Sequence, residues 1–172
     1  MVEDHSRFWS FSLTVYSNPD VRKECLELQD RHNIDVNLLL FCAFAGAVHG
    51  AVLPETSLRE AADLVGGWHN DVVTNLREAR RALKPFTTGS LSAASVAAAL
   101  RNSVKAMELE AERLEQRMLE AWSQSRLGTW PRMQGTEAAA ANICALFALG
   151  AGSAAAPELP RHLVVAAIAA AR

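Results

Sequence analysis

One apolar stretch constrains the fold of this chain more than any other feature. From Leu38 to Val48, eleven consecutive residues carry no polar side chain. A helix that is apolar around its whole circumference is buried on all sides, in the centre of a helical bundle or in a membrane. Asp35, Asn37 and His49 leave this stretch well short of the ~18 apolar residues that a spanning helix needs. The sequence therefore predicts a buried bundle helix and no membrane span.

The residues that flank this helix predict where it begins and ends. Asp35 is a favourable N-cap, because its carboxylate can accept hydrogen bonds from the free amides of the first turn. Gly50 suits the left-handed conformation that follows many helix C-termini. Asn33 is expected to end the preceding helix in the same way, and Asn18 and Pro19 are expected to start it.

The middle of the chain predicts two further helices with a double glycine between them. Ser57 and Glu60 form a capping box that opens a two-turn helix through Val65. Gly66 and Gly67 are expected to break this helix. Apolar residues then repeat at helical spacing up to the Lys84–Pro85 step, at Trp68, Val72, Leu76, Ala79 and Leu83.

The longest predicted helix runs from Leu91 to Ser125 and carries an apolar seam with spacings of three and four residues. The seam consists of Ala93, Val96, Leu100, Val104, Met107, Ala111, Leu114, Met118 and Trp122. Such a seam can pack inside its own molecule or against a second chain. Because heptads rich in alanine and methionine pack weakly, we expect intramolecular packing.

From Leu127 the composition becomes rich in alanine, and two more helices are predicted, Thr136 to Leu149 and Pro160 to Ala171. Small side chains bury little area each, so the subregion 127–172 is expected to be mobile or to need a partner. Together these features predict an all-α, single-domain helical bundle over residues 1–172. It has seven or eight helices around the central apolar helix.

Composition and charge exclude several classes of function. A chain of 172 residues with a net charge of −2 has no general attraction to nucleic acid or to anionic lipid. Cys25, Cys42 and Cys144 form no C-x-x-C pair and lie within apolar helical patterns. This indicates small core residues in a reducing compartment. The acidic start MVEDHSR predicts no secretory signal. We therefore expect a cytoplasmic protein with no metal ion and no cofactor.

The first candidate site is a polar turn placed directly before the most apolar helix. It comprises Gln29, Asp30, Asp35 and Asn37. Carboxylates beside an apolar wall can act as acid and base, and oxygen ligands suit hard cations. The spacing matches no calcium loop. The alternative is structural, with these side chains capping helix ends and bonding buried backbone groups.

The second candidate site is a basic strip on the helix that ends near residue 84. Arg77, Arg80, Arg81 and Lys84 lie at i, i+3, i+4 and i+7, on one side of that helix. They predict contact with an acidic partner or with the glutamates of the following helix. Nucleic acid is disfavoured because no aromatic residues are interleaved with them. The segment Trp68–Asp71 is a weaker candidate, in which exposed helix amides would hold an anion.

Five strings give the chain a family resemblance: FWSFSLTVY, VRKECLELQD, DVNLLLFC, NLREARRALK and ELEAERLEQ. Over about residues 7 to 120 it resembles a family of small bacterial conserved proteins of unknown function. The resemblance implies a helical cytoplasmic protein of bacterial type and brings no activity with it. The sequence contains no G-x-S-x-G, Walker or dinucleotide motif. It therefore predicts a non-enzymatic interaction or adaptor protein that binds a protein partner or a second copy. The alternative is a small-molecule or metal-binding protein, with or without catalysis, that uses the polar turn.

Overall fold

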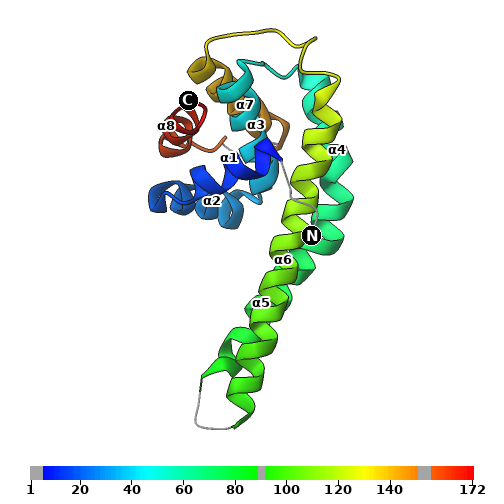
Figure 1. Cartoon of the computed structure of the whole chain (residues 1–172), viewed down its shortest axis with the longest axis vertical. Coiled ribbons are helices and arrows are strands. Elements are labelled where there is room, and N and C mark those ends of the chain that lie inside the picture. The colour runs from blue at the N-terminus through cyan, green and yellow to red at the C-terminus, as the bar shows by residue number, and fades with distance from the viewer. Residues whose placement is uncertain (1–5, 89–91, 151–155) are drawn as a thin grey trace. The chain divides into compact units, whose positions relative to one another are not determined.

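The computed structural model describes residues 6–88, 92–150 and 156–172, and these residues fold as α-helices (Figure 1). Within these ranges β-pairing is limited to one isolated antiparallel bridge between Ala51 and Arg132. The predicted all-α class is confirmed, and the helices agree with the predicted number of seven or eight. The chain divides into two compact units, unit 1 (Met1–Leu64 and Gln116–Arg172) and unit 2 (Val65–Glu115). The single domain predicted over residues 1–172 stays a prediction.

The elements follow one another without a sheet. In chain order they are α1 (Arg7–Tyr16), α2 (Pro19–His32), α3 (Val36–His49), α4 (Glu55–Trp68), the π-helix η1 (His69–Val73), α5 (Thr74–Leu83), the 3₁₀-helix η2 (Lys84–Thr87), α6 (Ser92–Gln124), α7 (Gly135–Gly150) and α8 (Arg161–Ala170). The boundary between the units falls inside α4 and inside α6.

Helix α3 is the centre of unit 1, as its sequence predicts. It packs against α1, α2, α7 and α8, and its residues 37–46 are all buried. Its predicted caps are confirmed: Asp35 accepts from the amides of the first turn, and Gly50 is left-handed with φ 60°. Asn33 ends α2 with φ 52°. No α-helix in the described ranges has both the length and the apolarity needed to cross a membrane.

The aromatic residues of α1 cover one side of α3. The ring centroid of Phe8 lies 5.6 Å from that of Phe41 and 5.1 Å from that of Phe44. Phe11 contacts Phe44 edge-on at 5.3 Å. Such ring pairs add about 0.5–1.5 kcal/mol each beyond the area that they bury. These contacts hold α1 on the core as an N-terminal clamp.

Helices α3 and α7 approach so closely that only glycine fits at their crossing. A Cβ atom built on Gly46 would lie 2.2 Å from the backbone nitrogen of Ala139. One turn further along α7, the fully buried Asn142 connects three backbone segments. Its Nδ2 donates to the carbonyls of Cys42 and Ala51, and its Oδ1 accepts from the amide of Leu53. The small residues of α7 thus permit contact between the two backbones.

Residues 127–172, which the sequence marks as a mobile subregion, supply α7 and α8 to the core of unit 1. Ile143 and Leu163 are fully buried there. Glu24 of α2 caps α8, because its carboxylate accepts from the amides of His162 at 3.1 Å and Leu163 at 2.9 Å. The mobility of this subregion stays a prediction. Cys144 is exposed, so the expectation that all three cysteines are core residues is wrong for this one.

Helix α4 differs from its prediction at both ends. It begins at Glu55, so Ser57 is not its N-cap, and the Ser57 hydroxyl instead accepts from Trp130 Nε1 at 3.1 Å. It also continues through Gly66 and Gly67 into η1 and α5. A helical glycine costs only about 1 kcal/mol relative to alanine, which tertiary contacts of the flanking residues can offset. One such contact is the bond from Trp68 Nε1 to the Ala111 carbonyl, at 3.0 Å.

Candidate functional site

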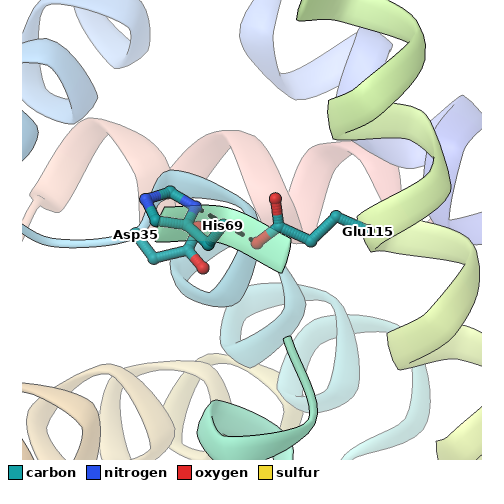
Figure 2. Close-up of side chains that lie close together, drawn as sticks. All are labelled: Asp35, His69 and Glu115. Atoms are coloured by element: carbon teal, nitrogen blue, oxygen red, sulfur yellow. Dashed lines mark ion pairs between the residues drawn. The ribbon is translucent and has the colours of Figure 1, made fainter. Parts of the chain in front are cut away.

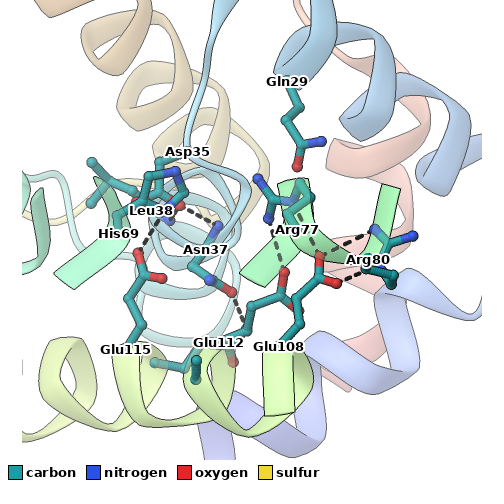
Figure 3. A network of polar contacts seen from close by, with 12 residues as sticks. Gln29, Asp35, Asn37, Leu38, His69, Arg77, Arg80, Glu108, Glu112 and Glu115 are labelled. Carbon is teal, nitrogen blue, oxygen red and sulfur yellow. Dashed lines mark hydrogen bonds and ion pairs between the residues drawn. The ribbon is translucent and has the colours of Figure 1, made fainter. Parts of the chain in front are cut away.

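The four residues of the predicted polar turn make three separate sets of hydrogen bonds in unit 1, and a ligand site there stays a prediction. Asp35 Oδ1 accepts from the amides of Asn37 at 2.8 Å and Leu38 at 3.3 Å, which is the geometry of an N-cap (Figure 3). Asn37 is buried, and its Oδ1 accepts from Gln116 Nε2 at 2.9 Å. The Gln29 side-chain amide donates to the carboxylate of the exposed Asp30. The structure therefore separates the turn into a helix cap, a buried amide pair and a surface pair.

Gln116 was not identified from the sequence as a member of this region. Its side chain is 2% exposed, and its Oε1 has no hydrogen-bond donor among the described residues. An unsatisfied buried acceptor costs about 1–3 kcal/mol, so such groups are rare. Gln116 lies beside Glu115 and near Leu119, which are both buried in α6. A polar residue next to such positions is the signal that could have identified it from the sequence.

Two residues of the basic strip contact glutamates of α6 within unit 2, and the other two have exposed side chains. Arg77 Nε donates to Glu108 at 3.2 Å, and Arg77 Nη2 donates to Glu112 at 3.0 Å (Figure 3). Arg80 binds both carboxylate oxygens of Glu108. The hydrogen bond to Glu108 is the main cause that raises the pKa of Arg80. The side chains of the remaining two residues, Arg81 and Lys84, are exposed.

His69 and Glu115 form a further contact of unit 2, which is an ion pair when His69 is protonated. His69 Nδ1 lies 3.3 Å from Glu115 Oε1 (Figure 2). The Glu115 side chain is fully buried, and that of His69 is 16% exposed. The segment Trp68–Asp71 lies inside the continuous run from α4 through η1, so the expected anion site at a helix N-terminus is wrong. The helix does not begin there because the double glycine does not interrupt it.

These ion pairs make the contact between α5 and α6 polar. We call their members the charged seam: His69, Arg77, Arg80, Glu108, Glu112 and Glu115. The three glutamates lie at i, i+4 and i+7 and therefore share one face of α6. Removing one partner of a buried ion pair costs far more than the pair contributes, because a buried charge is left uncompensated. The charged seam therefore fixes how the two helices pair.

Large apolar side chains of α6 lie outside the charged seam. We call them the apolar stripe: Val96 (68% exposed), Leu100 (52%), Met107 (59%) and Leu114 (42%). The seam predicted to pack inside the molecule is therefore only partly internal, with Ala111 buried and these four residues exposed. The physical reason is that Glu108 and Glu115 occupy the buried face of the helix. Their ion pairs fix the rotation of α6 and turn the stripe outward.

An apolar hollow of unit 2 continues the apolar stripe toward η2. It encloses about 660 Å³ and is lined by Leu83, Pro85, Phe86, Val96, Leu100 and alanines of the first turns of α6. Phe86 is 67% exposed. The hollow joins residues of both helices of the unit, so the apolar surface extends across the hairpin at this end.

Burial controls the ionisation of other titratable groups of unit 1. Desolvation raises the pKa of Cys25 to about 12 and that of Cys42 further still. Both thiols are therefore protonated near neutral pH and are poor nucleophiles. Desolvation also lowers the pKa of His49, and the guanidinium groups of Arg7 and Arg132 lower it further. The dipole at the C-terminus of α3 favours a charged histidine and so acts to raise this pKa. Desolvation and the two guanidinium groups outweigh it.

We expect His49 to make unit 1 less stable in acid. Because its pKa is lowered in the folded chain, the unfolded chain binds the proton more readily. The stability contributed by neutral His49 is present above the ordinary histidine pKa of about 6.5 and is lost as the pH falls below it. Thermal unfolding midpoints measured from pH 8 to pH 5 should fall more steeply for the natural protein than for His49→Gln. Equal slopes would contradict this assignment.

A family model described as "Protein of unknown function (DUF2390)" matches residues 7–119 of the chain. No curated protein and no solved structure matches it. The matched range contains the charged seam and the apolar stripe, together with the helices α1 to α5. It ends before α7 and α8.

Proposed function

We propose that this chain, which belongs to the DUF2390 family of proteins of unknown function, is a non-enzymatic interaction protein that binds a helical protein surface through the apolar stripe. The observation that carries the proposal is the exposure of Val96, Leu100, Met107 and Leu114 on one side of α6. Large apolar side chains that lie exposed on one side of a helix mark sites of protein contact. An amphipathic helix of a partner is recognised by apolar anchors at spacings of three, four and seven residues.

The use of the polar candidates supports a non-enzymatic role. The Asp35 carboxylate is engaged as a helix cap, and Asn37 bonds Gln116 inside unit 1. Arg77 and Arg80 are engaged with the glutamates of the charged seam. For partner contact by the basic strip, the proposal uses the two residues whose side chains are exposed, Arg81 and Lys84. Charges at the rim of an interface affect the association rate and its salt dependence more than the affinity.

We place this interaction in the bacterial cytoplasm. The support is that Cys25, Cys42 and Cys144 are all free thiols. Unpaired cysteines are typical of a reducing compartment.

A photo-crosslinking residue placed on the apolar stripe tests the proposal in living cells. We expect Leu100→p-benzoylphenylalanine to give a discrete adduct after irradiation. The matched control is Leu109→p-benzoylphenylalanine, because Leu109 is also an exposed leucine of α6 but lies outside the stripe. The control should give no discrete adduct. The absence of any adduct at position 100, or equal adducts at both positions, would overturn the proposal.

A further inference from the structure

We propose that the partner of the apolar stripe is a second copy of this chain, paired antiparallel through α6 about a two-fold axis near Met107. This inference rests on the proposed function and names its partner. It follows from three features of unit 2: the charged contact between α5 and α6, a stripe that is symmetric in sequence, and the positions of the charges.

The buried apolar residues described in unit 2 include Val65 and Val73, which precede α5, whereas Arg77 is the residue of α5 that is buried. The positions at which α5 and α6 meet are occupied largely by the charged seam, with Arg77 and Glu108 buried. Large apolar side chains lie outside this contact, and Phe86 and Val96 are each about two-thirds exposed. Helical domains are stable when the apolar face of each helix is buried against another element. A second hairpin laid on the first would complete a four-helix arrangement.

The apolar stripe is symmetric about Met107. Leu100 precedes it by seven residues and Leu114 follows it by seven, which is two helical turns, or about 10 Å, in each direction. In an antiparallel pair with the axis at Met107, Leu100 of each copy therefore faces Leu114 of the other. A seven-residue repeat is the spacing that keeps one helix facing another along its length. The same surface patch thus serves both partners, as a two-fold contact requires.

The charges near the stripe are compatible with this pairing. No residue from Pro85 to Leu100 is charged, so this end of the stripe brings no charge of its own to the contact. Beside the stripe, Glu110 forms an ion pair with Arg113 at 3.6 Å. In the antiparallel pair the residue that mirrors Glu110 across Met107 is Val104, so this carboxylate does not face its own copy.

The first experiment measures the mass of the purified full-length protein by sedimentation equilibrium at tens of micromolar. We expect twice the chain mass of 18.6 kDa. Met107→Glu should weaken the dimer at least about a hundredfold, because it buries two facing carboxylates in an apolar contact. Leu109→Glu is the matched control, since it adds the same charge to an exposed leucine about 200° away around the helix. The control should remain a dimer, and circular dichroism should show both variants to be helical.

A charge-rescue pair tests the direction of the helices. Leu100→Glu alone and Leu114→Lys alone should both give monomers. The double variant Leu100→Glu, Leu114→Lys should recover the dimer, because opposite charges then face each other at both ends. In a parallel dimer the double variant would bring like charges together and remain a monomer, which would overturn the antiparallel pairing.

The outcomes also separate this inference from the proposed function. A natural protein that is monomeric at these concentrations would overturn the second copy as partner. An adduct of Leu100→p-benzoylphenylalanine with a different protein would then leave the interaction function standing. A dimer that Met107→Glu leaves intact would place the contact elsewhere and overturn the assignment of the stripe. A monomeric protein that also gives no adduct at position 100 would overturn both.

Discussion

Replacing Gly46 with alanine is expected to destabilise unit 1 by about 3 kcal/mol or more, at the upper end of the effects of overpacking. The added Cβ would lie 2.2 Å from the Ala139 nitrogen and 2.4 Å from its Cα. Both are backbone atoms, so no change of rotamer relieves the clash, and α3 and α7 must move apart. That movement also strains the three hydrogen bonds of Asn142. Urea unfolding followed by circular dichroism measures the loss.

Gly67→Ala is the matched control for this substitution. Gly67 also lies inside a helix, but a Cβ built there meets nothing within 4 Å. Alanine in place of a helical glycine should stabilise by about 0.5–1 kcal/mol. The two glycines should therefore respond with opposite signs. If Gly46→Ala were neutral, the close approach of α3 and α7 would be incorrect.

The second large effect is expected at Arg77. Arg77→Met keeps much of the aliphatic length of the side chain but removes the charge that binds Glu108 and Glu112. The Arg77 side chain is 11% exposed and that of Glu108 is 7% exposed. Removing one member of a buried ion pair costs about 3–5 kcal/mol, because the remaining charge loses its partner without regaining water. Hydrogen exchange of the α5 amides should report the loss within unit 2.

Arg81→Met is the control for the loss of a positive charge on the same helix. The Arg81 side chain is exposed, and substitutions at such surface positions change stability by about 0.5 kcal/mol or less. A comparable loss at both positions would mean that net charge, and not the charged seam, determines the stability of unit 2. Glu108→Gln should reproduce the Arg77 effect, since Arg77 and Arg80 both bind that carboxylate.

Helix class and helix ends were predictable from the sequence because they depend on neighbouring residues. The N-caps Asn18 and Asp35 and the left-handed Asn33 and Gly50 all lie where the sequence places them. Each acts through its own side chain or backbone angles within a few residues of the helix end. The central position of α3 was equally readable, since a helix without a polar face has no side to leave in water.

Predictions about the sites depended on partners that local spacing does not reveal. Spacing places Arg77 and Arg80 on one side of α5, but their partners lie about 30 residues later on α6. Asp35 and Asn37 are two residues apart, and only their tertiary contacts separate a helix cap from a buried amide pair. The double glycine is a further case in which local spacing does not reveal the outcome. Each helical glycine costs about 1 kcal/mol, and tertiary contacts that keep α4 continuous offset this cost.

The sequence by itself determined that this chain is helical, that α3 lies in a core and that α6 is long. The tertiary structure decided which face of α6 is buried. Its sequence contains an apolar series and an acidic series on adjacent faces, and either could in principle point inward. A buried carboxylate requires a partner, and the histidine of η1 and the arginines of α5 supply partners for Glu108 and Glu115. The acidic face of α6 is therefore the buried one. Leu100, Met107 and Leu114 are left on the surface as a consequence.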